Sequence, residues 1–341
     1  MLTREAILLV RLDGVGDAAL CIPALEGMRR AFPQASFGAI CSPANVALFS
    51  QRVAHLHLYR QGNPISALRD ELRAAGYTRA LIATEEVAGY QLGRLSGAPA
   101  RAGFWHGLQK PFKSLWQRGQ LSAPVYRPAA WTLSPEHEVA TLYRLAQALG
   151  AKAPPPAEAD ALRSWLRVEP SDRARAAQGA VAFQITPKLL SGGWAPTALA
   201  QLVRVALDAC GCNRAVLIAS EQDQNLACSI LEHLPPALVS AASIEVLAAL
   251  SLPRWLGALR AAAAVVTPDT GAAHVAGMLG AGVVDLFDEP DYERLSQQWH
   301  PWAGVSRCLV KKAWRPGIET SLGRQIGEAV HAVTNEWQQK Y

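Results

Sequence analysis

Long apolar runs are the first feature that this 341-residue chain lacks, although half of its residues are hydrophobic. A membrane-spanning helix needs about 18 or more consecutive apolar residues, and no window of the sequence reaches that length. Glu5 and Arg11 bracket an apolar run that is too short for a secretory signal. We therefore expect a soluble, cytoplasmic protein whose contact with the inner face of the membrane is at most peripheral.

Cysteines are also few. Six are scattered along the chain, and none belongs to a Cys-x-x-Cys pair. A metal site built on Cys210 and Cys212 lacks the second pair that would complete it, so we expect no metal ion. Cys21, Cys41 and Cys210 fall on apolar faces, which indicates core thiols in a reducing compartment.

Basic clusters interleaved with aromatic residues, which are typical of nucleic-acid binding, are missing apart from one segment described below. The formal net charge is +5 and the pI is about 9.0, with arginine far more frequent than lysine. Arginine is well suited to binding phosphates and carboxylates. We therefore expect no nucleic-acid partner, and favour an acidic small molecule or an anionic membrane surface.

What the sequence does contain, near its start, is a strand followed by a glycine-bearing turn. The apolar run 7–10 predicts a buried strand, and Gly14, Gly16 and Asp17 follow it before a helix expected over 18–31. Backbone N–H groups at such a place face a ligand at the carboxyl edge of a parallel sheet. Asp17 is therefore expected to project toward that edge.

The G-x-G-x-x-A spacing from Gly14 to Ala19 formally matches a dinucleotide fingerprint. That fingerprint needs an acidic residue after the second strand to bind a ribose, but the strand expected over 37–41 is followed by serine and proline. Asp17 would also place a carboxylate where the pyrophosphate lies. The sequence thus disfavours an NAD site, and leaves Asp17 either a chemical role or that of a helix-capping carboxylate.

Short apolar runs alternate with helical segments along the chain, which predicts an α/β protein with parallel sheets covered on both faces. Three prolines at 154–156 mark a linker, and the alternation restarts beyond it with a strand over 180–183. We expect domains over residues 1–152 and 153–318, and a C-terminal helix over 319–341 whose expected contacts include the first domain. The other expected strands are 55–59, 80–83, 215–219, 263–267 and 283–287, and the other expected helices are 65–75, 87–95, 137–149, 197–209, 225–233 and 253–260.

One segment breaks this alternation. Residues 101–113 mix basic and aromatic residues with glycine and proline and show no regular period. We expect a loop on a rigid sheet that binds an acidic or sugar-like partner through Arg101, Lys110 and Lys113. The alternative is a surface loop whose aromatic rings pack locally.

A second strand-turn-helix unit lies near the far end, over residues 265–280. Asp269 or Thr270 is expected to cap its helix. Thr270 and Gly271 offer a hydroxyl and backbone N–H groups to an anion, and His274 lies one turn later on the same face. Taken alone, a capping aspartate and a helical histidine are more often structural than functional.

Taken together, these motifs resemble glycosyltransferase family 9, the heptosyltransferases. They are R-L-D-G-V-G-D at 11–17 followed by a helix with P-A-L, R-A-G-F at 101–104, and P-D-T-G-A-A-H-V-A at 268–276. The likeness implies a GT-B fold, in which two Rossmann-like domains with parallel sheets face each other across a cleft. It also implies an inverting, metal-independent transfer of a sugar, usually heptose from ADP-heptose, to a glycan or glycolipid acceptor in lipopolysaccharide core biosynthesis.

The resemblance also implies roles for individual residues. Asp17 would be the catalytic base of an acceptor-binding first domain, with Gly14 and Gly16 beside it. This chemistry requires a base for the acceptor hydroxyl and positive surroundings for the departing diphosphate, and it implies no cofactor. The residues assigned to the nucleotide sugar in the second domain are Thr186, Lys188, Asp223, Asp269, Thr270, Gly271 and His274.

The chain departs from the family at two positions. The family usually carries a phosphate-binding lysine two residues before a tryptophan and proline, and Gly192 stands there in this sequence. Lys188, the only lysine between Lys152 and Lys311, is expected to take over that role. The alternatives are that glycine N–H groups replace the charge of the missing lysine, or that Lys188 is a solvated loop residue. The family's glycine after the strand phenylalanine is replaced by Asp288.

Two other functions stay open at this stage. An NAD-dependent oxidoreductase is disfavoured by Asp17 and by the missing ribose carboxylate. A nucleotide-sugar-binding protein without turnover is not distinguished from an enzyme by sequence.

Overall fold

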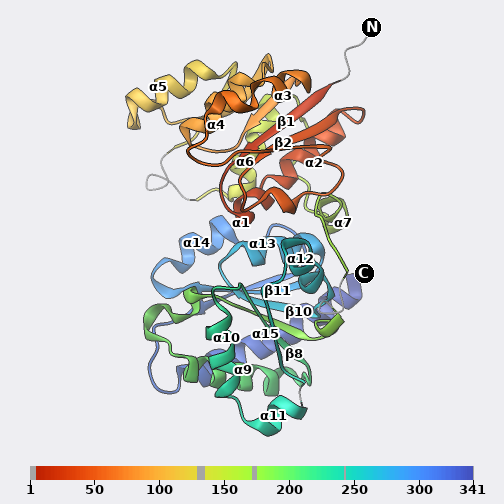
Figure 1. Cartoon of the computed structure of the whole chain (residues 1–341). Coiled ribbons are helices and arrows are strands. Elements are labelled where there is room, and N and C mark those ends of the chain that lie inside the picture. Colours follow the sequence, from red (N-terminus) through yellow and green to blue (C-terminus); the bar gives the residue numbers. More distant parts are fainter. Residues whose placement is uncertain (1–4, 129–134, 171–174, 242, 341) are drawn as a thin grey trace. The chain divides into compact units, whose positions relative to one another are not determined.

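The chain divides into two compact units in the computed structural model (Figure 1). The first comprises residues 1–157 and 164–167, and the second comprises 158–163 and 168–341. The proline-rich segment 154–156 lies directly before the division. The residues that the structure describes are 5–128, 135–170, 175–241 and 243–340.

The first unit contains a six-stranded parallel sheet in the order β3-β2-β1-β4-β5-β6. Its central strand β1 is buried along nearly its whole length because helices cover both faces of the sheet, as is usual for parallel strands. The strands are β1 (Ala6–Arg11), β2 (Ser36–Cys41), β3 (His55–Leu58), β4 (Arg79–Ile82), β5 (Ala100–Trp105) and β6 (Ala123–Tyr126). The helices are α1 (Val15–Ala19), α2 (Ile22–Ala31), α3 (Arg69–Ala74), α4 (Val87–Leu95), α5 (Pro111–Gln120) and α6 (Glu138–Ala148), with 3-10 turns η1 (Val46–Leu48), η2 (Ile65–Leu68) and η3 (Gly107–Gln109).

The single helix expected over 18–31 is wrong in detail, because the structure has two helices there. α1 begins directly after Gly14 and ends at Ala19, and α2 begins at Ile22. Pro23 lies in the first turn of α2, and a proline has no N–H to continue the hydrogen bonds of the preceding helix.

The loop expected over 101–113 is also wrong. Residues 100–105 form β5, which pairs with both β4 and β6, and α5 begins at Pro111. The strand was hidden in the sequence by Gly103, which is needed because a Cβ there would lie 2.8 Å from Leu121 Cδ2. Only residues 106–110 connect the strand to the helix.

The second unit repeats the topology of the first, with a six-stranded parallel sheet in the order β12-β11-β10-β7-β8-β9. This repetition confirms the α/β class expected from the alternating sequence. Its strands are β7 (Val181–Ile185), β8 (Ala215–Ala219), β9 (Glu245–Ala248), β10 (Ala264–Pro268), β11 (Gly282–Asp288) and β12 (Ser306–Lys311). Its helices are α7 (Ala159–Arg163), α9 (Pro196–Cys210), α10 (Gln224–Glu232), α11 (Pro236–Ala241), α12 (Leu252–Ala261), α13 (Gly271–Leu279), α14 (Tyr292–Trp299) and α15 (Ile318–Lys340), with 3-10 turns η4 (Pro187–Gly193) and η5 (Glu289–Asp291).

The C-terminal helix α15 packs along α9 of the second unit. Gly323 and Gly327 allow the close approach, since a Cβ at either position would lie under 3 Å from a backbone oxygen of α9. The helix α15 also contacts β10, β11 and β12, so it belongs to the core of the second unit. Its expected packing against the first domain stays a prediction.

Candidate active site

Each sheet has a topological switch point, the place where ligands of open α/β sheets bind. In the first sheet the strand order reverses between β1 and β4, and in the second between β7 and β10. The segments after three of these strands, β1, β7 and β10, carry most of the residues that the sequence singles out.

Arg11 organises the switch point of the first sheet. Its Nε lies 2.8 Å from Asp13 Oδ2, its Nη2 lies 2.9 Å from Asp17 Oδ1, and its Nη1 donates to the carbonyl of Ala83, beyond β4. The arginine side chain is nearly buried, whereas that of Asp17 is well exposed. The guanidinium therefore fixes the position of Asp17 while leaving its carboxylate accessible.

The turn between β1 and α1 is held in place from the neighbouring strand β2. Asn45 Nδ2 donates to the carbonyl of Asp13 at 2.8 Å, and Ser42 Oγ donates to the same oxygen at 3.2 Å. Gly14 is the N-cap of α1, and Gly16 lies inside the helix. The loop after β2, where a dinucleotide site would carry a ribose-binding carboxylate, is thus bonded to the turn itself.

A charged network that the sequence analysis missed extends this edge through the loops after β4, β5 and β6. His106 Nε2 lies 3.2 Å from Glu85 Oε2, and Arg127 binds both carboxylate oxygens of Glu138 at 3.0 Å. The interaction with His106 is the main reason why the pKa of Glu85 is lowered to about 2, whereas burial raises the pKa of Glu138. Glu85, His106 and Arg127 each follow shortly after a strand, and that position is the signal by which they are recognisable.

The structure separates the three basic residues expected to bind the acceptor. Arg101 lies near the amino end of β5, about 13 Å along the strand from its carboxyl end. Its side chain donates to the carbonyls of Gln120 and Ala98, so it has a structural role there. Lys110 and Lys113 lie just beyond the carboxyl end of β5, around the start of α5, and both are exposed.

Lys188 lies at the switch point of the second sheet. It follows β7 in η4, and its Nζ lies 2.8 Å from Oδ2 of Asp269, which follows β10. Thr270 caps α13 by accepting from the N–H of Ala272, so Gly271 begins that helix. The hydroxyl of Thr186 is buried and has no hydrogen-bond partner among the residues that the structure describes. The site therefore combines an ammonium group, a helix N-terminus and a hydroxyl that a ligand can satisfy.

A second lysine, which the sequence analysis did not consider, lies beside this site. Lys311 ends β12, is only 3% exposed, and donates to Asp288 Oδ1 at 2.7 Å and to Ser191 Oγ at 2.7 Å. Gly192 has φ +73°, and a Cβ there would lie 3.1 Å from Ala313 Cα. A lysine side chain at position 192 would thus be strained. Lys311 and Asp288 form an ion pair beside Ser191, the residue before Gly192.

The other two residues assigned to the donor are His274 and Asp223. His274 is nearly buried in α13, with its ring centroid 6.3 Å from that of Trp299. Asp223 follows β8 and accepts a hydrogen bond from Ser220 Oγ at 2.7 Å. Asp285 is fully buried on β11, and burial followed by the charge of Asp269 raises its pKa well above the ordinary value.

Within the described ranges, no three histidine, cysteine or acidic side chains gather in a way that would hold a metal ion. No helix in the described part of the chain is long and apolar enough to cross a membrane.

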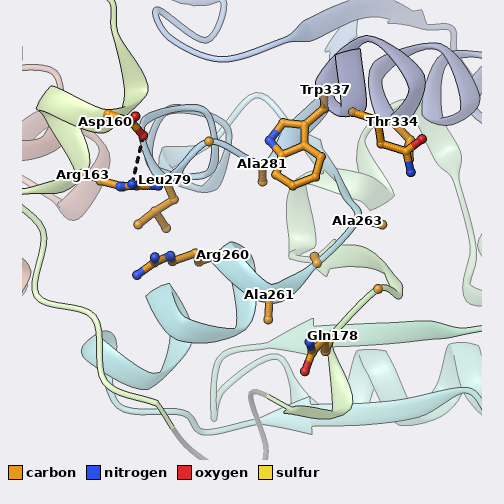
Figure 2. Close-up of a pocket in the computed structure, with 14 residues that line it drawn as sticks. Asp160, Arg163, Gln178, Arg260, Ala261, Ala263, Leu279, Ala281, Thr334 and Trp337 are labelled. Carbon is orange, nitrogen blue, oxygen red and sulfur yellow. Dashed lines mark ion pairs between the residues drawn. The ribbon is translucent and has the colours of Figure 1, made fainter. Parts of the chain in front are cut away.

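Figure 2 shows a separate cavity of about 460 Å³ in the second unit. Arg260, Ala263, Leu279 and Trp337 are among its lining residues. Because Ala263 and Ala281 precede β10 and β11, the cavity lies at the amino ends of these strands, opposite the edge that carries Lys188. It is therefore distinct from the switch point.

The family is settled by a sequence comparison. The model of glycosyltransferase family 9 (heptosyltransferase) matches residues 65–316, well over half of the chain. The chain belongs to glycosyltransferase family 9. It is thus a glycosyltransferase, and the resemblance inferred from the three motifs is confirmed.

Solved structures of similar fold agree with this assignment. "E. coli ADP-heptose lps heptosyltransferase II" has a TM-score of 0.73 and 17% identity, covering 99% of this chain and 100% of its own. A family 9 glycosyltransferase from Veillonella parvula DSM 2008 has a TM-score of 0.72 and 16% identity, covering 97% of both chains. E. coli heptosyltransferase WaaC with ADP has a TM-score of 0.70 and 20% identity, covering 98% of this chain and 100% of its own. No curated protein matches the sequence significantly. The similar folds confirm the GT-B class expected from the sequence.

Proposed function

We propose that this family 9 glycosyltransferase transfers heptose from ADP-heptose to a hydroxyl group of an acidic glycan or glycolipid of the cell envelope. In this proposal the anomeric carbon is inverted and no metal ion takes part. The observation that carries it is the cluster of Lys188, Asp269, Thr270 and Gly271 at the switch point of the second sheet. The similar WaaC structures contain ADP and ADP-2-deoxy-2-fluoro heptose, which supports the donor class.

The second edge supplies the positive surroundings that a diphosphate needs. The N-terminus of a helix is equivalent to roughly half a unit of positive charge, and its free N–H groups bind phosphate oxygens. That charge neutralises a departing nucleoside diphosphate only in part. Lys188 adds an ammonium group beside α13, and its ion pair with Asp269 fixes that group near the helix start while offsetting part of its charge.

The first edge supplies the base. Asp17 accepts the proton of the acceptor hydroxyl while the hydroxyl oxygen forms a bond to the anomeric carbon. The bond from that carbon to the diphosphate oxygen breaks at the same time, and the electron pair leaves with the diphosphate. Arg11 Nη2, 2.9 Å from Asp17 Oδ1, holds the carboxylate in position for this step.

A donor screen with product analysis tests the proposal. Thermal shift with ADP-heptose, ADP-glucose, UDP-glucose and GDP-mannose should show the largest stabilisation with ADP-heptose, since a ligand that binds only the folded state stabilises it. Incubation with ADP-heptose and a heptose-free envelope glycolipid should then give a product one heptosyl unit heavier, and excess EDTA should not reduce the yield. Stabilisation without any product would instead identify a nucleotide-sugar-binding protein, and would overturn the proposal.

A further inference from the structure

The helix α5 buries polar side chains and exposes large apolar ones, which is the opposite of an ordinary surface helix. Its buried face carries Ser114, Gln117 and Gln120, while Phe112 and Leu115 point outward. Surface helices normally bury their apolar stripe and expose the polar face. Trp116 of this helix packs against the core of the first unit, whereas Phe112 and Leu115 lie outside that core.

The buried polar side chains of α5 are engaged in hydrogen bonds. Ser114 Oγ accepts from the backbone N–H of His106 at 2.9 Å, and Gln117 Nε2 donates to the carbonyl of Glu85 at 3.3 Å. These bonds attach the helix, in this orientation, to the loops after β5 and β4, which lie at the same sheet edge as Asp17. The outward direction of Phe112 and Leu115 is thus built into the fold.

The outward side chains form one apolar patch together with the preceding turn η3. Leu108 and Phe112 are each 88% exposed and Leu115 is 61% exposed, the three largest values among the large hydrophobic residues of the described chain. Monomeric proteins rarely expose such side chains in a group without an interaction partner. Figure 1 shows α5 beside α4 at the periphery of the first unit.

The charge around the patch identifies the kind of partner. Lys110 and Lys113 are exposed between and beside the apolar side chains, and no acidic residue occurs from Trp105 to Arg127. An apolar face rimmed by cations binds membranes by burying its side chains at the headgroup boundary and attracting anionic lipids. A soluble glycan would engage the lysines but would leave Leu108, Phe112 and Leu115 in water.

We propose that the patch formed by Leu108, Lys110, Phe112, Lys113 and Leu115 docks the enzyme on an anionic lipid surface. His106, which follows β5 at the same sheet edge as Asp17, lies two residues before Leu108, the first residue of the patch. A membrane-anchored acceptor would therefore present its sugar end to the edge that carries Asp17. This use of the patch rests on the proposed function, whereas the docking itself requires no acceptor and no turnover.

Flotation with vesicles that contain no glycolipid tests the docking directly. The full chain should float with vesicles of phosphatidylcholine and phosphatidylglycerol, and much less with phosphatidylcholine alone or in high salt. Replacing Phe112 and Leu115 together with serine should reduce the bound fraction at least tenfold, because two large apolar contacts are lost. The double variant Lys110→Glu with Lys113→Glu should have a lower affinity for the anionic vesicles, by roughly fivefold for each lysine removed.

Matched variants keep the test specific. Leu56→Ser with Leu58→Ser alters two exposed leucines on the opposite edge strand β3, and should leave vesicle binding unchanged. Equal binding by the Phe112/Leu115 variant and the parent would overturn the proposal. Binding only to vesicles that carry the glycolipid would identify a glycan site and would also overturn the proposal. A dimer in sedimentation that depends on the patch, without any vesicle binding, would overturn it as well. A parent chain that binds vesicles but shows no turnover would contradict only the proposed function.

Discussion

The two sheets of this enzyme share one topology, but their carboxyl edges carry different chemistry. The first edge places an accessible carboxylate, Asp17, on a nearly buried arginine, and continues in a network of acidic and basic residues. The second edge places Lys188 beside the N-terminus of α13. The difference shows that one repeated fold can carry different side chains at the same edge, so the residues after the strands, and not the fold, decide which chemistry is open to each edge.

Replacing Asp17 should break the first half of this comparison with the largest effect. Asp17→Asn removes the proposed base but retains the size of the side chain, so turnover should fall by roughly a hundredfold or more. Asp70→Asn is the matched control, because Asp70 is likewise an acidic residue in the first turn of a helix. Steady-state rates of heptosyl transfer measure both variants. Similar small losses in the two would show that Asp17 only stabilises its helix.

Replacing Lys188 should break the second half. Lys188→Ala should weaken the binding of ADP by about 1.5–3 kcal/mol, the scale of a hydrogen bond to a charged group, and affect adenosine much less. Lys312→Ala removes a nearby exposed lysine, whose Nζ lies 3.6 Å from Glu289, and should change neither affinity. Calorimetric titrations with both ligands measure the difference. An equal loss for ADP and adenosine would leave the helix N-terminus alone as the phosphate site.

The pH dependence of stability should also differ between the two units, and in the first unit it depends on Glu26. Burial would raise the pKa of Glu26, but hydrogen bonds from Arg29, Trp165 and Arg30 outweigh it and lower the pKa to about 2. The stability this carboxylate contributes is present above its ordinary pKa near 4.5 and is lost as the pH falls toward 2. Glu26→Gln should therefore cost about 1.5–3 kcal/mol in the free energy of unfolding at pH 7, and clearly less at pH 3.

Urea unfolding at the two pH values measures this effect. Asp160→Asn, which removes an exposed ion pair with Arg163, should cost under about 1 kcal/mol at either pH. A penalty for Glu26→Gln that is the same at pH 3 and pH 7 would contradict the assigned pKa.

The second unit should show the opposite trend through Asp285. Burial raises the pKa of this carboxyl, so the folded state keeps it protonated at pH values where the unfolded chain ionises. Its presence therefore lowers stability as the pH rises above the ordinary pKa. Asp285→Asn cannot ionise, and should be more stable than the parent by about 1–3 kcal/mol at pH 8 and by much less at pH 4. Urea unfolding in which the variant is less stable at pH 8 would rule this out.

The sequence predicted most of the fold because each apolar run is bounded by glycine, proline or charge. The strands 7–10 and 263–267 lie within one or two residues of β1 and β10. The segment 101–113 was misjudged because Gly103 and the basic residues interrupt the apolar pattern of β5, whose strand character comes from its two neighbours in the sheet.

The position of a candidate site residue was predictable where the residue follows a strand by one short turn, as Asp17 and Asp269 do. Lys311 was not, because its role depends on Ser191 and Asp288, which lie far away in the sequence. Arg101 was assigned to the acceptor by composition, but its place at the amino end of β5 is visible only once the strand is known. Glu85, His106 and Arg127 each follow a strand, but two of those strands, β5 and β6, were not among the expected ones, so the network was missed.

The central claim, that the second edge binds the diphosphate and the first does not, is tested most directly by one series of ADP titrations. Calorimetry on Asp17→Asn, Asp70→Asn, Lys188→Ala and Lys312→Ala compares the two edges under the same conditions. We predict a dissociation constant about 10- to 150-fold higher for Lys188→Ala and values within about twofold of the parent for the other three. A loss for Asp17→Asn as large as that for Lys188→Ala, or no loss for Lys188→Ala, would contradict this division of roles.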